Sequence, residues 1–441
     1  IGGSNDEPIV NSTEKTIEYA VKMRQFPNSA RLDRVLERGE LSEPMVRDLA
    51  RQVARFHAGA DASRSQDDKQ RSEQRFIEIS ENFDCLEQLP DSPDRNKLIS
   101  ELRDWSMESL VLNGDQLRRR RQDGFVRECH GDMHLENLAL LDGRIVVFDA
   151  LEFSESLRWT DVLCEVAFMV MDFLHRKRPD LASVFLSTYL EVTGDYEGLT
   201  LARHYLVYRA LVRAKVSAFR YYQLGVGEDR KSSALRDVDD YLRLARHCTR
   251  VNRHPFLIIT CGPSGAGKSY LSDRLCGMLG AIRIRSDTER RRRALPEENR
   301  YSAFARHRTY MRIEANADKV LYAGFPVIVD ATFIRREYRS KLWHLANDRG
   351  VPFGVLWITA PADELKRRVT LRSAAGTDAS EADVSVLEKQ LQEIEPLSRA
   401  EREFALEVDT SRQFDPGSIE RFVRRIQRLP LEHRFRRHFR G

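Results

Sequence analysis

The stretch Gly262-Pro263-Ser264-Gly265-Ala266-Gly267-Lys268-Ser269 decides the fold of the second half of this chain. It fits G-x-x-x-x-G-K-[ST], the phosphate-binding loop (P-loop) of nucleotide-using proteins. The apolar run 256–260 before it predicts a buried strand, and apolar residues after it recur at helical spacing. In such a loop, backbone N–H groups surround a phosphate and the positive end of the following helix favours the anion.

The loop residues therefore define a predicted ATP site. Lys268 is expected to reach the β- and γ-phosphates, and the Ser269 hydroxyl is expected to hold Mg²⁺. A glycine-rich turn that fits the pattern by chance is the alternative, although strand, motif and helix occur in the required order. The other predicted nucleotide contacts are Gly262, Ser264, Gly265, Ala266, Gly267 and Tyr270.

Length and composition favour an ordinary globular protein with two or three domains, since 441 residues are 41% apolar and 32% charged. The net charge of +4 gives no argument for nucleic acid as a partner. Positive charge is nevertheless concentrated at Arg118–Arg121 and at Arg290–Arg293. Each run is expected to be a solvated helix face, with contact to phosphate or nucleic acid as the alternative.

The six cysteines form no C-x-x-C pair, which argues against a zinc site or a disulfide framework. Their usage predicts a reducing compartment, and we expect the cytoplasm. No apolar stretch approaches the length of a membrane span, so no membrane partner is predicted. No signal peptide is visible, although the chain begins at Ile1 rather than Met, so its natural start can be missing.

The second half alternates between predicted strands and helices. Five strands are expected, at 256–260, 281–285, 326–329, 353–358 and 405–408. Strand–helix alternation predicts an α/β fold, here a P-loop NTPase domain with a five-stranded parallel sheet and helices on both faces. We expect this domain to span 254–430, and the mainly helical first domain to span 1–250.

Two carboxylates are expected at the edge of this sheet where its strands end. Asp330 ends the apolar strand Val327-Ile-Val-Asp330, the Walker-B position for a carboxylate that orients Mg²⁺. Asp287 follows the second strand, and the ends of parallel strands meet at one edge. We expect Asp287 to accept a proton from an attacking hydroxyl, with a helix N-cap as the alternative role.

A basic helix and a polar loop follow, at about 365–390, and predict a mobile lid. Small P-loop kinases close such a lid over ATP and bring arginines to the transferred phosphoryl group. Arg368 and Arg372 lie four residues apart and so share one helix face. Salt bridges to Asp363 or Glu364 are the alternative for these arginines.

Together these features resemble the small kinases of the P-loop superfamily, which include gluconokinase, shikimate kinase, zeta-toxin and the phage polynucleotide 5′-kinase. The residues that carry the resemblance are the P-loop, R-S-D at 285–287, V-I-V-D-A-T-F at 327–333 with Arg335 and Arg336, and the lid at 376–383. The resemblance covers about 254–430. It implies ATP-dependent phosphorylation of a hydroxyl, with Lys268, Asp287 and Arg372 as catalytic residues.

In the first half, His130-Gly-Asp-Met-His-Leu-Glu-Asn137 separates Asp132 from Asn137 by the interval of the kinase catalytic loop. There the Asp accepts the hydroxyl proton and the Asn holds a metal. A strand at 145–148 leads into Asp149, where kinases place a second metal-binding Asp. A zinc site built on His130, Asp132 and His134 is the alternative.

This pattern resembles the aminoglycoside phosphotransferase family, which shares the protein-kinase-like fold, in the branch fused to a P-loop kinase. The resemblance implies a mainly helical kinase-like C-lobe and, for the fusion, covers nearly the whole chain. A strand is expected at Thr16–Met23, and a helix at 44–58 has Val46, Leu49, Ala50, Val53 and Phe56 on one face. His57, at the end of this helix, is expected to be a satisfied core or cap histidine.

One departure from the family concerns ATP binding by the first half. No glycine-rich strand pair and no lysine of the V-A-I-K type precedes the expected hinge at 24–26. Either the chain is truncated or its first half lacks an ATP clamp of its own. We therefore expect the chemistry in the P-loop half rather than at Asp132, Asn137 and Asp149.

The sequence thus predicts an ATP- and Mg²⁺-dependent kinase that acts on a hydroxyl of a small, sugar-like molecule. A polynucleotide 5′-kinase is one alternative, motivated by the arginines beside Asp287. A non-catalytic ATP-gated switch is another, motivated by the missing lobe. The sequence predicts no oligomeric state.

Overall fold

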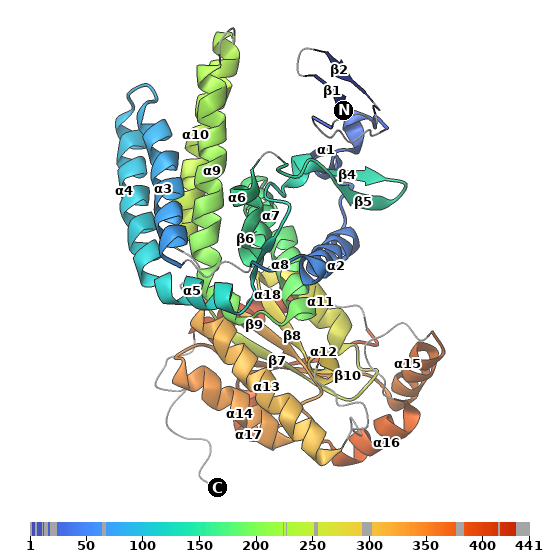
Figure 1. Ribbon diagram of the computed structural model, residues 1–441. Helices are drawn as coiled ribbons and strands as arrows, with labels where there is room; N and C mark the ends of the chain where they lie inside the picture. Colours follow the sequence, from blue (N-terminus) through green and yellow to red (C-terminus); the bar gives the residue numbers. More distant parts are fainter. Residues whose placement is uncertain are drawn as a thin grey trace. The chain divides into compact units, whose positions relative to one another are not determined.

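The structure is a computed structural model of residues 1–441 (Figure 1). The chain divides into two compact units. The first unit comprises residues 1–41 and 135–148, and the second comprises residues 42–134 and 149–441. The residues that the structure describes are 2–4, 7–10, 12, 16–17, 24–63, 68–152, 154–223, 225, 227–250, 255–292, 302–375, 383–412 and 415–428.

The first unit is built from short elements around a β-hairpin. In that hairpin β4 pairs antiparallel with β5, and Asp142 and Gly143 at its turn both have positive φ, as a tight hairpin turn requires. The strand expected at Thr16–Met23 lies mostly outside the described residues. The elements are β1 (Gly2–Gly3), β2 (Pro8–Ile9), η1 (Asn28–Ala30), α1 (Leu32–Glu37), η2 (Leu135–Asn137), β4 (Leu138–Leu141) and β5 (Arg144–Val147).

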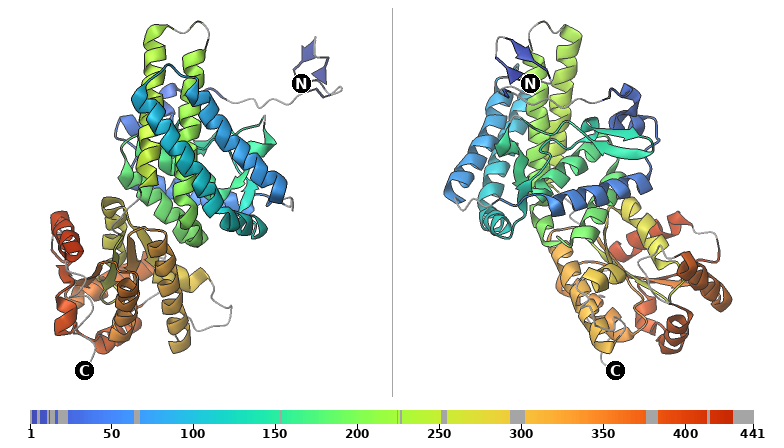
Figure 2. Two further views of the ribbon diagram at one scale, coloured as in Figure 1. Left: turned by 90° about the vertical axis from the view of Figure 1, so that its left-hand side faces the viewer. Right: turned by 45° about the vertical axis from the view of Figure 1, so that its right-hand side comes forward.

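The second unit begins with a mainly helical region, as predicted. Its helix α7 is apolar on almost every side and is buried over nearly its whole length. Figure 2 shows α9 and α10 as a long antiparallel pair. The elements are α2 (Glu43–Gly59), α3 (Asp68–Glu87), α4 (Pro93–Leu112), α5 (Gly114–Gln122), β3 (Val126–Glu128), α6 (Glu155–Arg158), β6 (Trp159–Asp161), α7 (Val162–His175), α8 (Pro179–Thr193), η3 (Glu197–Leu201), α9 (Ala202–Tyr222) and α10 (Glu228–Thr249).

Helix α2 corrects one detail of the expected apolar face. The other four predicted residues of that face are buried, but Phe56 is 45% exposed. The buried row continues from Val53 to His57 instead, because residues four apart lie on the same helix face.

The rest of the second unit is an α/β region, and its five predicted strands are confirmed. They form a parallel sheet in the order β11-β10-β7-β9-β8. The elements are β7 (Leu257–Cys261), α11 (Lys268–Leu279), β8 (Ile282–Arg285), α12 (Ser286–Arg292), α13 (Ala303–Tyr322), β9 (Val327–Asp330), α14 (Arg336–Asp348), β10 (Phe353–Thr359), α15 (Ala362–Ala375), α16 (Val384–Glu393), α17 (Arg399–Arg402), β11 (Ala405–Asp409) and α18 (Pro416–Arg428).

Helices cover both faces of this sheet. One face packs against α11, α15 and α18 through a core that includes Ile258, Leu275, Leu356 and Phe422. The other face packs against α13 and α14. Strand β7, at the centre, is buried at every residue, as expected for a parallel strand covered on both sides. This arrangement presents the carboxyl ends of the strands at one edge.

The arginine run at 118–121 is only half as solvated as expected. Arg118 and Arg119 are exposed, but Arg120 is 4% exposed. Its guanidinium donates to both oxygens of Asp161 (2.7 and 2.9 Å) and of Asp195 (2.7 Å each). Arg120 is therefore an internal ion-pair partner rather than a surface cation, because α5 turns that face toward the start of α7.

We predict that Arg120→Ala lowers the free energy of unfolding by about 3–5 kcal/mol, since it leaves two buried carboxylates without their cation. Urea unfolding followed by circular dichroism measures this. The matched control is Arg119→Ala, which removes the exposed neighbour on the same helix and is expected to change stability by less than about 0.5 kcal/mol. Equal effects of the two substitutions would contradict the structural role of Arg120.

Candidate active site

The P-loop connects β7 to α11 at the carboxyl edge of the sheet. Gly262 has φ 149°, and a Cβ at this position would lie 2.2 Å from the Ile358 carbonyl oxygen, so a larger residue cannot fit. Gly267, with φ 87°, immediately precedes α11 in the left-handed conformation. These two glycines let the loop pass close to β10 and then turn into the helix.

Lys268 lies in the first turn of α11, and its side chain folds back over the loop. Its Nζ donates to the Pro263 carbonyl at 2.8 Å. Burial lowers the pKa of Lys268, while the nearby carboxylates Asp330 and Asp287 oppose the shift, and the net direction is downward. The ammonium thus lies in a desolvated place beside two acids, where a phosphate is a favourable partner.

Asp330, the last residue of β9, is 4% exposed. Its Oδ2 makes no hydrogen bond and lies 3.5 Å from Arg285 Nε. Ser269 lines the same cavity as Asp330. A buried carboxylate oxygen without a hydrogen bond and a serine hydroxyl in the same cavity are oxygen donors of the kind that Mg²⁺ prefers. These residues therefore fit the ion that the sequence predicts.

The cavity at the P-loop has a volume of about 460 Å³, and it brings Lys268, Ser269, Asp287, Asp330 and Arg372 together. Five of the predicted nucleotide contacts line it as well as Ser269: Ser264, Gly265, Gly267, Lys268 and Tyr270. Gly262 and Ala266 are buried within the loop. The roles predicted for all of these residues stay predictions.

Asp287 lies in the first turn of α12. Its Oδ1 accepts a hydrogen bond from Arg290 at 2.8 Å, one turn further along the helix. The carboxylate is part of the cavity wall and is partly exposed. It is thus within reach of a molecule in the cavity, and Arg290 keeps it oriented.

Helices α15 and α16 form the described part of the predicted lid, whose polar loop at 376–382 lies outside the described residues. Arg368 donates to Glu364 (2.6 Å) and to Thr410 Oγ1 (2.8 Å), so the salt-bridge alternative applies to this arginine. Hydrogen bonds from Arg367 and Arg368 lower the pKa of Glu364 to about 2. Arg372 lines the cavity, as a lid arginine would.

Several lining residues were not predicted from the sequence. Gln390 on α16 accepts the Ser264 N–H at 2.7 Å, so this helix touches the P-loop directly. Arg306 and Arg335 both lie against Glu393 (3.5 and 3.2 Å). The Tyr310 and Tyr338 rings stack with centroids 3.9 Å apart. Position was the available signal for Arg335, Tyr338 and Gln390, which follow strand β9 or belong to the lid, whereas Arg306 and Tyr310 on α13 had none. Local patterns do not say which of these residues face inward.

In the first half, the loop at 130–134 carries Asp132 in a cationic setting. His134 Nε2 lies 3.3 Å from Asp132 Oδ2, and Arg213 Nη1 lies 3.3 Å from the same nitrogen. Burial alone would raise the pKa of Asp132, but His134, Arg213 and Arg209 lower it more strongly, so the net direction is downward. His134, Arg213 and Arg209 thus favour the ionised form of Asp132.

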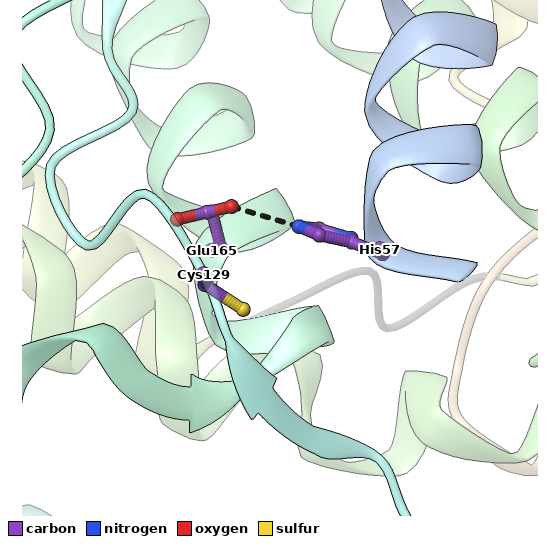
Figure 3. Close-up of side chains that lie close together, drawn as sticks. All are labelled: His57, Cys129 and Glu165. Carbon is purple, nitrogen blue, oxygen red and sulfur yellow. Dashed lines mark hydrogen bonds and ion pairs between the residues drawn. The ribbon is translucent and has the colours of Figure 1, made fainter. Parts of the chain in front are cut away.

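A buried network behind this loop involves His57, Glu165 and Cys129, which Figure 3 shows close together. His57 Nε2 lies 2.7 Å from Glu165 Oε2, and His57 Nδ1 lies 2.9 Å from the Tyr189 hydroxyl. Glu165 Oε1 accepts the Gly131 N–H at 2.7 Å. The expectation that His57 is a satisfied core histidine is confirmed.

This trio was not predicted, whereas the proposed zinc set was His130, Asp132 and His134. Among the described residues, His57, Cys129 and Glu165 are the group whose possible ligand atoms lie within 4.8 Å of one another. Both His57 nitrogens already have partners, and burial raises the pKa of the Cys129 thiol well above its usual range. The arrangement is therefore a hydrogen-bonded brace for the Gly131–Asp132 backbone rather than a metal centre.

Asn137 and Asp149, the other predicted metal ligands of the first half, belong to different units. Asn137 is 8% exposed in η2, and its carbonyl accepts the Phe148 N–H at 3.1 Å. Asp149 is exposed and has φ 63°, an uncommon conformation for a residue other than glycine.

Comparison with known families identifies both halves. The model of the phosphotransferase enzyme family (APH) matches residues 31–201, and the model of an AAA domain (AAA_33) matches residues 257–397. The chain fuses a phosphotransferase-family domain to a P-loop kinase-type domain. Uncharacterized proteins of Mycobacterium tuberculosis and Mycobacterium bovis are each 27% identical over 374 residues, which are 82% of this chain and 74% of theirs.

Solved structures resemble parts of the fusion. A gluconokinase from Sinorhizobium meliloti is 22% identical and covers 42% of this chain and 93% of its own, with a TM-score of 0.27. An ethanolamine kinase from Plasmodium vivax is 12% identical and covers 47% of this chain and 61% of its own, with a TM-score of 0.31. In the part of the fusion that the structure describes, no helix is long and apolar enough to cross a bilayer.

We predict that Gly262→Ala in the P-loop domain weakens ATP binding by at least roughly tenfold, because the new Cβ would displace either the loop or β10. Isothermal titration with ATP measures the dissociation constant. Gly350→Ala is the matched control, since Gly350 also has positive φ but a Cβ there meets nothing within 4 Å. Similar losses in both variants would mean that backbone strain, not the contact with Ile358, decides the effect.

For the phosphotransferase domain, we predict that Glu165→Gln lowers the free energy of unfolding at neutral pH. We also expect this free energy to fall less steeply with decreasing pH in the variant than in the wild type. Burial would raise the pKa of Glu165, but hydrogen bonds from His57 and Gly131 lower it below the ordinary 4.5. The carboxylate therefore stabilises the fold above pH 4.5, and this contribution is lost as the pH falls through the lower folded-state pKa. Urea unfolding between pH 7 and pH 3 measures the effect, with the exposed Glu152→Gln as control. An unchanged pH dependence in Glu165→Gln would contradict it.

Proposed function

We propose that this fusion is an ATP-dependent kinase that transfers the γ-phosphoryl group of ATP to a hydroxyl of a small, sugar-like molecule in the P-loop cavity. The observation that carries the proposal is the meeting of Lys268, Ser269, Asp287 and Asp330 in one cavity of about 460 Å³. The two matched families support phosphotransferase chemistry in general. The location of the chemistry and the acceptor are our proposal.

The binding roles follow from charge and position. The P-loop amides and Lys268 bind the phosphates, because they present N–H donors and a cation at the start of α11. Arg372, on α15, adds a second cation to the lining of the cavity. Ser269 and Asp330 would hold Mg²⁺, which when bound neutralises charge that develops on the phosphates.

The proton transfer follows from Asp287. Its carboxylate orients the acceptor hydroxyl and accepts its proton as the oxygen attacks the γ-phosphorus. The new bond joins the acceptor oxygen to phosphorus, and the bond from that phosphorus to the β,γ-bridging oxygen breaks, releasing ADP. Arg290, which donates to Asp287 Oδ1 at 2.8 Å, holds this carboxylate in place.

The cavity walls suit a small polar acceptor. The stacked tyrosines Tyr310 and Tyr338 and the cations Arg306 and Arg335 offer apolar faces, hydroxyls and hydrogen-bond donors, as a polyol needs. Helix α16 contacts the P-loop through Gln390 and contributes to the lining of the cavity. Two of the arginines that motivated the polynucleotide alternative, Arg283 and Arg285, are engaged by Glu191 instead.

We predict that Lys268→Met lowers acceptor-dependent ATP turnover by roughly 10²- to 10³-fold, because it removes a preorganised cation from the developing charge. The assay uses Mg²⁺, ATP and pooled sugars, aminoglycosides, nucleosides and 5′-hydroxyl oligonucleotides. Asp132→Ala is the matched control and is expected to retain turnover. The responding pool identifies the acceptor class.

Three outcomes would contradict the proposal. Activity lost in Asp132→Ala but kept in Lys268→Met would locate the chemistry in the phosphotransferase domain. A response from the oligonucleotides alone, with substrate affinity that falls steeply as salt rises, would indicate a polynucleotide kinase. ATP binding without turnover on any acceptor would indicate a nucleotide-gated switch.

A further inference from the structure

Helix α8 of the phosphotransferase-family domain ends against strand β8 of the P-loop domain. Near its end, Glu191 is largely buried, with its side chain 14% exposed. Its Oε2 accepts from Arg283 Nη2 at 2.9 Å, and its Oε1 accepts from Arg285 Nη1 at 3.3 Å and from Thr288 Oγ1 at 3.1 Å. One carboxylate thus fixes three side chains of the other domain.

Neighbouring contacts hold this junction in register. Ser187, one turn earlier on α8, accepts the Arg283 N–H at 2.9 Å, at the side of strand β8. Arg292 at the end of α12 donates to the Glu191 and Val192 carbonyls (2.8 and 3.0 Å). The carboxylate of Glu191 is therefore placed by backbone and side-chain contacts on both sides, and it is not a mobile surface group.

The two arginines that Glu191 holds lie next to the proposed Mg²⁺ ligands. Arg285 Nε is 3.5 Å from Asp330 Oδ2, the buried oxygen without a hydrogen bond. Arg283 Nη1 is 3.5 Å from the Ser269 carbonyl and 2.7 Å from Asp273 Oδ1. Glu191 is therefore one side chain removed from both proposed ligands, although it lines no part of the cavity.

Arg285 is the decisive side chain, because its guanidinium lies between the carboxylates of Glu191 and Asp330 and is close to both. A distance of 3.5 Å is too long for a strong charge-assisted hydrogen bond, so Asp330 Oδ2 remains open to a metal ion. Without the carboxylate at position 191, the Arg285 guanidinium would move toward Asp330. It would then compete with a cation for the same oxygen, since like charges disfavour each other at short range.

We propose that Glu191 is a positioning residue of the P-loop site: by holding Arg285 back from Asp330, it keeps that carboxylate available to Mg²⁺. The kinase-type site of the P-loop domain then depends on a residue that the phosphotransferase-family domain supplies. This inference rests on the proposed function, since it takes Asp330 as a metal-binding residue.

The test measures Mn²⁺ binding to the full chain in the presence of a non-hydrolysable ATP analogue, by electron paramagnetic resonance. Glu191→Gln keeps the size of the side chain and its acceptor oxygen but removes the charge. It is expected to weaken Mn²⁺ affinity roughly five- to tenfold. Arg285→Met is expected to strengthen Mn²⁺ binding, and Glu191→Gln/Arg285→Met is expected to bind as tightly as Arg285→Met alone.

The matched control is Asp180→Asn, which neutralises another carboxylate on α8 whose ion-pair partner is Arg178, within the same domain. It is expected to leave Mn²⁺ affinity unchanged. A stability-only role for Glu191 would lower the unfolding midpoint without a change in Mn²⁺ affinity, and that result would overturn the inference. If Glu191→Gln does not fold, Arg285→Met decides alone, and Mn²⁺ affinity equal to that of the wild type in this variant would overturn the inference.

The outcomes separate this inference from the proposed function. If the wild-type chain turns over ATP and Glu191→Gln binds Mn²⁺ as tightly as the wild type, the role of Glu191 is overturned but the proposed function is not. A double variant as weak as Glu191→Gln would show that Arg285 is not the intermediary and would also overturn it. No binding of Mn²⁺ with the analogue by the wild-type chain would overturn both proposals.

Discussion

The parallel pairing of β7 between β9 and β10 is the constraint on which the rest of the P-loop region depends. It brings Gly262, Asp330 and the end of β8 to one edge, where backbone N–H groups and carboxylates can meet a ligand. The pairing also explains why no side chain fits at position 262, since the loop leaves β7 close to the Ile358 carbonyl of β10. A parallel sheet covered on both faces cannot shift its register without exposing its core, so the geometry of the edge is fixed by packing far from it.

Buried arginines with carboxylate partners recur through the second unit, within an arginine run at Arg120 and outside such runs at Arg283 and Arg339. Arg120, Arg283 and Arg339 are each less than 9% exposed and each lies against acids from elsewhere in the sequence. Such pairs contribute little net stability, because desolvation offsets most of the attraction, but losing one partner costs much. Their effect is to specify which surfaces meet. Charge runs in this chain therefore indicate internal contacts as much as solvated faces.

Local sequence patterns predicted the helices and strands, but they could not predict contacts between segments that are distant in the sequence. The five strands and the P-loop follow from periodicity and a motif that span fewer than about twenty residues each. His57 and Glu165 are 108 residues apart, and Arg283 and Glu191 are 92 apart, so no window of sequence relates them. The same reason explains the error at Arg120: its run is polar locally, and only the fold brings Asp161 and Asp195 against it. Phe56 was wrongly assigned to the buried face of α2. The next residue, His57, takes that place, because its hydrogen bonds to Tyr189 and Glu165 satisfy the polar ring in the core.

Within three residues, helix α8 contacts side chains that support the Gly131–Asp132 loop and side chains that adjoin the P-loop cavity. Its Tyr189 contacts His57, whose partner Glu165 holds the Gly131 N–H beside Asp132, and its Glu191 holds the arginines beside Asp330. The helix is buried from Val184 to Leu190, so both contacts are made by one rigid, closely packed segment of the core.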